Sequence, residues 1–153
     1  MKSLIRAFGL LAASAVAAGC QPSQSVQCQA LLQVTYAARL RPTSLADSAT
    51  LLVQADRYEQ AAAALQKIEL SDRALLESQA ALSDAYDTVA IALRRRADLV
   101  DASGTLRYTS IHPQQKAAVR SAQAAEADSY RQLRQTAAQL YRRCNQPLDE
   151  AGR

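Results

Sequence analysis

The sequence contains no tryptophan, one phenylalanine and one histidine, and its only methionine is residue 1. Glycine is also scarce, since the only glycines after Cys20 are Gly104 and Gly152. What remains is dominated by Ala, Leu, Gln and Arg, which all favour helices. Little in this composition suits a β-rich fold, and it predicts an all-α protein.

Motifs for catalysis and for cofactors are missing as well. His112 lies directly before Pro113, where a cap or turn residue is expected rather than a general base. There is no Glu-x-x-His pair for a metal in a helical bundle and no Cys-x-x-Cys-His for haem. A Ser or Cys nucleophile would have no base to activate it. We therefore expect no catalytic residue, no metal and no cofactor, and we expect that the protein is not an enzyme.

The N-terminus has the pattern of an export signal. Lys2 and Arg6 precede an apolar stretch, residues 7–19, that has the length of a signal-peptide core and is too short to span a bilayer. Residues 1–19 are predicted to be removed. The small residues at 17–19, followed by Cys20, resemble the lipobox of bacterial lipoproteins. An ordinary cleavable signal and an uncleaved anchor are the alternatives.

The lipoprotein resemblance implies that Cys20 carries a diacylglyceryl group and an amide-linked acyl chain such as palmitate after cleavage. Two or more acyl chains hold a protein stably on a membrane. Gln21 stands where the enteric sorting rule has Asp for inner-membrane retention. The resemblance therefore implies a cell-envelope protein, on the outer membrane and facing the periplasm if there are two membranes. Nucleic acid is not expected as a partner in this compartment.

The chain after the signal has room for one domain with its own core. Residues 20–27 are polar and predict a short lipidated tether, residues 28–146 the helical bundle domain, and residues 147–153 a C-terminal tail.

Four prolines divide the chain, and four helices are expected between them. The first two are predicted over residues 25–40 and 44–69. The third starts near residue 71 or 72 and ends before a connection at about 102–112, and the fourth starts at Pro113 and has Cys144 in its last turn. Ser44 with Asp47 resembles a capping box, and Ser71 and Asp72 are candidate caps of the third helix. The third and fourth helices carry apolar stripes with helical spacing. These are Leu75, Leu82, Tyr86, Val89, Leu93 and Val100, then Ala122, Glu126, Tyr130, Leu133, Ala137, Leu140 and Cys144.

Short connections favour an antiparallel up-down-up-down four-helix bundle. Such a bundle brings the start of the first helix and the end of the fourth to the same end. Cys28 and Cys144 occupy these positions, so we predict that a disulfide between them closes the bundle. Free thiols, pairing with another chain, and three long helices with the first packed across an end are the alternatives.

Asp-x-Tyr occurs three times, ending at Tyr58, Tyr86 and Tyr130. Each Tyr lies on the apolar stripe of its helix, and the Asp two residues earlier points outward. The three rings should meet at mid-height, with Tyr36 close to the same level. They predict either a core layer of aromatic rings or a tyrosine-lined pocket for a small apolar or aromatic ligand.

Basic residues accumulate in the second half of the domain. Residues 39–93 hold 5 basic and 8 acidic side chains, whereas residues 94–153 hold 11 and 6. The main contributors are Arg94, Arg95, Arg96, Arg131, Arg134, Arg142 and Arg143. These arginines either pair with acids on neighbouring helices or contact phosphate headgroups or an acidic partner.

Two functions follow from this pattern. The first is a non-catalytic interaction, adaptor or structural lipoprotein with an envelope protein as partner, which predicts an exposed apolar or charged patch. The alternative is a small-molecule or lipid-binding bundle that uses the tyrosine layer, which predicts a cavity.

Overall fold

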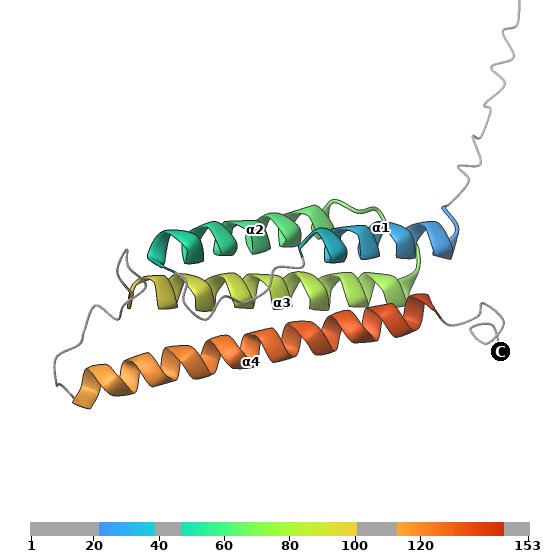
Figure 1. The fold of residues 1–153 in the computed structure, drawn as a ribbon. Coiled ribbons are helices and arrows are strands. Elements are labelled where there is room, and N and C mark those ends of the chain that lie inside the picture. The colour runs from blue at the N-terminus through green and yellow to red at the C-terminus, as the bar shows by residue number, and fades with distance from the viewer. Residues whose placement is uncertain (1–21, 39–46, 101–112, 146–153) are drawn as a thin grey trace, which may run out of the picture.

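The computed structural model describes residues 22–38, 47–100 and 113–145, and these residues form α-helices and no strand (Figure 1). The all-α prediction is therefore confirmed. The helices are α1 (Gln24–Ala37), α2 (Ser48–Gln66), α3 (Arg73–Ala97) and α4 (Pro113–Cys144). Residues 1–21, which include the expected signal segment and Cys20, lie outside the described part, as do residues 39–46, 101–112 and 146–153.

Aspartates cap the starts of α2 and α3. The backbone N–H of Thr50 donates to the Asp47 carboxylate at 2.7 Å, and that of Leu75 donates to the Asp72 carboxylate at 2.9 Å. Each aspartate satisfies an N–H that the first helical turn leaves free. The expected Asp72 cap is confirmed. The predicted start at Ser44 is wrong, because the helix begins only after Asp47, whose own side chain is the cap.

Helix α1 begins earlier than the sequence pattern predicts. It starts at Gln24, so the last residues of the expected 20–27 tether are helical. Gln27 is buried, and its amide donates to the Pro22 carbonyl at 2.7 Å and to the Ser71 hydroxyl at 2.9 Å. Its side-chain oxygen accepts from the N–H of Ser71 at 2.8 Å. Because these bonds satisfy backbone groups ahead of α3, Gln27 fixes the start of α1 beside the start of α3.

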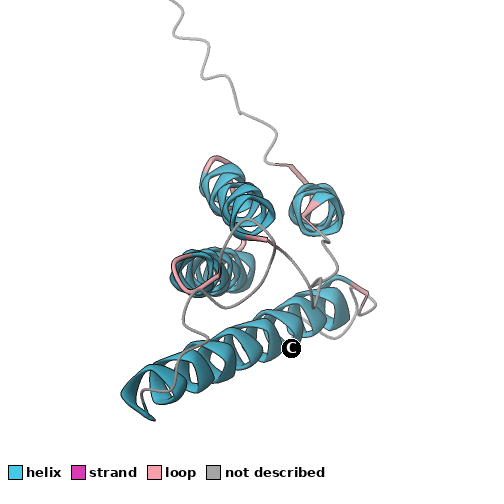
Figure 2. Ribbon diagram, turned by 60° about the vertical axis from the view of Figure 1, so that its left-hand side comes forward, coloured by secondary structure: helices cyan, strands magenta, loops and turns pink. Residues whose placement is uncertain are grey.

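The helices differ in how much of their length they share with their neighbours. Helix α2 lies along α3, and α3 lies along α4, whereas the short α1 contacts all three at one end of the molecule (Figures 1 and 2). The predicted α3 stripe forms the centre of the core, since all six of its residues are buried. In the α4 stripe Glu126, Tyr130, Leu133 and Leu140 are buried. No helix in the described part of the chain is long and apolar enough to cross a membrane.

The predicted disulfide between Cys28 and Cys144 is confirmed. It joins the first turns of α1 to the last residue of α4, with the two Cα atoms 5.5 Å apart. Cys28 belongs to the buried core and Cys144 packs against it. The crosslink therefore holds α1, the shortest helix, against the end of α4, the longest.

Candidate functional site

Three tyrosines meet in the interior, as the Asp-x-Tyr pattern predicts. The rings of Tyr58 on α2 and Tyr86 on α3 stack with centroids 5.7 Å apart. The ring of Tyr130 on α4 meets that of Tyr58 edge-on at 6.1 Å. All three side chains are buried, while the aspartates that precede them are exposed. Stacked and edge-on contacts are the favourable geometries for such rings, so the layer stabilises the contact between α2, α3 and α4.

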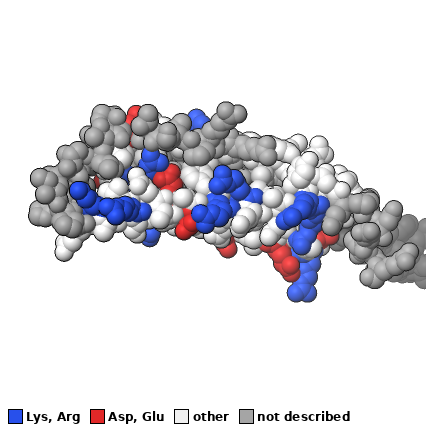
Figure 3. Space-filling view, turned by 60° about the horizontal axis from the view of Figure 1, so that its bottom comes forward, with Lys and Arg blue, Asp and Glu red and all other residues white. Residues whose placement is uncertain are grey.

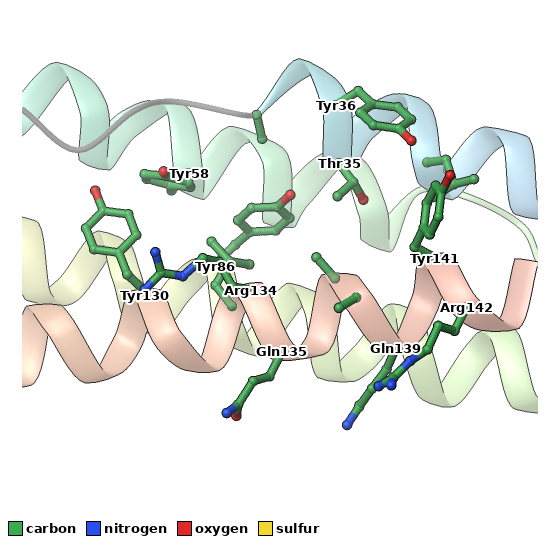
Figure 4. Close-up of a pocket in the computed structure, with 15 residues that line it drawn as sticks. Thr35, Tyr36, Tyr58, Tyr86, Tyr130, Arg134, Gln135, Gln139, Tyr141 and Arg142 are labelled. Atoms are coloured by element: carbon green, nitrogen blue, oxygen red, sulfur yellow. The ribbon is translucent and has the colours of Figure 1, made fainter.

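Tyr36 does not join this buried layer. It is 47% exposed on α1 and lies near Tyr141 of α4, away from the other three tyrosines (Figure 4). Its predicted position at the same level is therefore wrong. The cause is the short α1, which covers only the disulfide end of the other helices and places Tyr36 in its last turn.

A cavity of about 790 Å³ connects the tyrosine layer with Tyr36. It runs between α1 and α4, with single residues of α2 and α3 at its inner end (Figure 4). Its lining residues in the described part of the chain are Leu32, Thr35, Tyr36, Ala38, Tyr58, Tyr86, Tyr130, Leu133, Arg134, Gln135, Ala137, Ala138, Gln139, Tyr141 and Arg142. All four tyrosines proposed from the sequence are among them, and none of these residues is acidic.

The sequence pattern missed Tyr141 and gave Arg134 no specific place. Tyr141 follows Ala137 by four residues, and Arg134 follows Tyr130 by four, so both lie beside the predicted α4 stripe. That spacing could have identified both residues, but both are exposed and therefore lack the apolar, buried character that marks the stripe.

The Tyr130 hydroxyl is the unusual polar group of the cavity. Tyr130 is 9% exposed, and its buried hydroxyl has no hydrogen-bond partner among the described residues. Burial raises the pKa of Tyr130 far above its ordinary value, with smaller contributions from Tyr58 and Glu126. Burial also raises the pKa of Tyr58. Although the Tyr58 and Tyr130 side chains interact, their hydroxyls do not meet hydrogen-bond geometry. Tyr130 is therefore a neutral donor without an acceptor among the described residues.

Substitution of Tyr130 by Phe should stabilise the protein without ligand. An unsatisfied buried polar group costs about 1–3 kcal/mol, and Phe removes only the hydroxyl while retaining the ring contact with Tyr58. We expect the free energy of unfolding, measured with urea, to rise by about 1 kcal/mol. Tyr141→Phe is the matched control, because Tyr141 is exposed and its hydroxyl can bond to water. A clear loss of stability in Tyr130→Phe would show that the hydroxyl has a partner.

Most arginines proposed as contacts for an anionic partner are engaged within the protein. Arg94 donates to Asp56 at 2.7 Å and to Glu59 at 2.8 Å, both on α2. Arg96 pairs with Glu126 of α4 at 2.9 Å. These pairs agree with the first of the two interpretations.

The remaining arginines of that set lie near the surface. Arg143 donates to the Ala74 carbonyl and to the Ser78 hydroxyl. Arg95 is exposed, and Arg142 lines the outer end of the cavity. In one view of the surface the basic side chains form several separate groups with acids between them, rather than one patch (Figure 3).

Two neighbouring acids and partial burial make the position of Asp87 unfavourable for a charged carboxylate. Asp87 is partly buried, and desolvation raises its pKa above 3.8, with repulsion from Asp84 and Glu59 adding to the effect. The folded state therefore binds a proton at Asp87 more tightly than the unfolded state does. It follows that stability declines as the pH rises through the pKa of the folded state.

We expect Asp87→Asn to raise the melting temperature at pH 7, because Asn remains uncharged. The gain should disappear at about pH 3, because this is below the ordinary pKa of Asp and Asp87 is then mostly protonated in both the folded and the unfolded state. Asp84→Asn removes the same charge from an exposed position and should give a smaller gain. Thermal unfolding followed by circular dichroism at both pH values tests this, and a lower melting temperature at pH 7 would contradict it.

No cluster of three or more His, Cys, Asp or Glu side chains suited to a metal ion occurs in the described residues. Comparison with known proteins gives no match, whether to a family model, to a curated protein or to a solved structure. The cavity is therefore the feature from which a function has to be argued.

Proposed function

We propose that this protein is a lipid-anchored helical bundle of the cell envelope that binds a small apolar or aromatic molecule in the cavity between α1 and α4. The cavity carries the proposal. Its volume of about 790 Å³ falls within the range of about 300–1,000 Å³ that is usual for ligand sites. Its walls are mainly tyrosine, leucine and alanine with a few polar groups, which is the composition of such sites.

An antiparallel up-down-up-down order of the helices is part of the proposal. Interhelix contacts support it. Along α2 and α3, Asp56 lies near Arg94, whereas Leu65 lies near Gln79, so the residue numbers run in opposite directions. Along α3 and α4, Arg96 pairs with Glu126, whereas Ser78 contacts Arg143. In this order both ends of the disulfide belong to one end of the bundle.

The anchor rests on the resemblance of residues 1–20 to lipoprotein signals. Cys20 lies only four residues before α1 begins at Gln24. A lipid on Cys20 would therefore hold the disulfide end of the bundle at the membrane surface, with the cavity close by. The mass of the intact protein exported through its own signal peptide tests this part, since an acylated Cys20 adds lipid mass and removes residues 1–19.

The role of an adaptor for an envelope protein ranks second. It requires a continuous exposed patch. The exposed large apolar side chains in the described part of the chain are spread over all four helices instead. They are Val26, Tyr36, Leu52, Val53, Leu76, Ile91 and Tyr141. Leu52 and Val53 are neighbours on α2, whereas Tyr36 and Tyr141 both belong to the cavity.

Binding of N-phenyl-1-naphthylamine, a neutral probe that fluoresces in apolar surroundings, tests the cavity. We expect saturable binding at one site per chain. Ala138→Trp should abolish it, because residue 138 lines the cavity and indole would fill part of the space. Ala124→Trp is the control, since residue 124 is an exposed position of the same helix outside the cavity. Equal binding by both variants would place the probe elsewhere and refute the proposal.

A further inference from the structure

The inner end of the cavity combines features that indicate the chemistry of its ligand, and this inference rests on the proposed function. We propose that the ligand is a single-chain anionic amphiphile whose acidic group binds between the Tyr130 hydroxyl and the Arg134 guanidinium. The apolar chain extends from there along α4 towards Tyr36 and Tyr141.

Tyr130 supplies the first argument. Tyr130 lines the cavity, and its buried hydroxyl has no partner among the described residues. A ligand that brings an acceptor to this hydroxyl would satisfy it. A carboxylate or phosphate oxygen is the strongest acceptor that a ligand can bring, and a hydrogen bond to a charged group contributes more than one to a neutral group.

Arg134 supplies the second argument. It lies one helical turn after Tyr130, and positions four apart are neighbours on the same helix face. Figure 4 shows its side chain extending towards the Tyr130 end of the cavity, whereas Gln135, Gln139 and Arg142 extend to the side of α4 that faces away from α1. Arg134 has no ion pair among the described residues, so its charge is available to a ligand.

The charges around Tyr130 and Arg134 are compatible with a bound anion. None of the described lining residues is acidic, and Glu126 lies one turn before Tyr130 on the same face of α4. Asp128 is nearer in sequence, but it is exposed. Both Glu126 oxygens accept from Arg96, at 2.9 and 3.1 Å, which offsets the negative charge. An acidic group beside Tyr130 therefore meets Arg134 without facing an uncompensated carboxylate.

The shape of the cavity selects a chain rather than a compact molecule. From Tyr130 to Arg142 the α4 wall is about 18 Å long at about 1.5 Å per residue. Along this wall the lining is mainly apolar or aromatic, with Leu32, Leu133 and Ala137 before the outer pair Tyr36 and Tyr141. Burial of an extended hydrocarbon chain along such a wall is favourable in proportion to the area removed from water.

Displacement of N-phenyl-1-naphthylamine by dodecanoate and by dodecan-1-ol, both below their micellar concentrations, tests the inference. We expect dodecanoate to bind more tightly than the alcohol. Arg134→Gln should weaken dodecanoate by about tenfold, the effect of losing one hydrogen bond to a charged group, and leave the alcohol unchanged. Tyr130→Phe should weaken dodecanoate as well, although it should raise stability. Arg131→Gln is the control, because Arg131 is exposed and pairs with Asp128 outside the cavity.

The possible results separate the two proposals. Equal affinity for acid and alcohol, or an Arg134→Gln variant that binds dodecanoate normally, would overturn the acidic-ligand inference and leave the cavity proposal in place. No binding of the neutral probe at all would overturn the proposed function instead. Dodecyl phosphate distinguishes the two sources of an acidic head: tighter binding than dodecanoate supports a phospholipid-derived ligand, and weaker binding supports a fatty acid.

Discussion

The double substitution Cys28→Ser with Cys144→Ser should lower the free energy of unfolding by up to about 4 kcal/mol. The bridge closes a loop with a sequence separation of 116 residues. In the chain-entropy model a loop of that length strongly restricts the unfolded chain, so its removal favours unfolding. The effect should be large because α1 is short, so that besides the bridge it is held by the Gln27 network and by few buried apolar side chains such as Leu31.

Urea unfolding of the oxidised, the reduced and the doubly substituted protein measures this effect. Reductant should lower the midpoint of the natural chain and have no effect on the variant, which is the internal control. We also expect reduced binding of N-phenyl-1-naphthylamine, because α1 forms one wall of the cavity and the bridge holds it against α4. An unchanged midpoint after confirmed reduction would show that packing alone holds α1 in place.

The sequence predicted those features that depend on periodicity and on strong local signals. The α3 stripe, the Asp72 cap, the helical start at Pro113 and the partner of Cys28 all follow from spacing or from the geometry of the backbone near a few residue types. The convergence of three tyrosines followed from their places on three apolar stripes. Each of these inferences needed only the chain itself and the rules of helix geometry.

What the sequence did not predict depends on relations between helices. Gln27 is a polar residue in a stretch that was expected to be a tether, and only the position of Ser71 in space explains why it is buried. Tyr36 missed the aromatic layer because the length of α1, not its periodicity, sets how far it reaches. The cavity is of the same kind, since periodicity identifies the side chains that face inward but not whether they fill the space between them.

Among the arginines, the pair with Glu126 should matter most for stability. Arg96 and Glu126 side chains are 17% and 9% exposed, and one Arg96 nitrogen donates to both carboxylate oxygens. Loss of one partner leaves the other charge buried without compensation, which costs about 3–5 kcal/mol in comparable pairs. We expect Glu126→Gln to lower the free energy of unfolding by an amount near the lower limit of that range, because Gln still accepts one hydrogen bond.

The contrast with Arg94 makes this expectation specific. Arg94 also pairs with acids on a neighbouring helix, but its side chain is 41% exposed, and the side chains of its partners Asp56 and Glu59 are similarly exposed. Exposed pairs contribute about 0–1 kcal/mol, so Arg94→Gln should change stability little. Equal losses in Arg94→Gln and Glu126→Gln would contradict the dependence on burial.

Replacement of both buried partners separates the cost of an orphaned charge from the value of the pair. The double variant Arg96→Met with Glu126→Leu leaves no charge without compensation and keeps side chains of similar volume between α3 and α4. We expect it to recover most of the stability that Glu126→Gln loses, as measured by urea unfolding. If the pair is retained for the cavity, the double variant should nevertheless bind dodecanoate differently, since Glu126 and Arg96 both act on Tyr130. Full recovery of stability together with altered dodecanoate binding would assign the pair to the electrostatics of the site. Full recovery of stability with unchanged dodecanoate binding would assign it to packing alone.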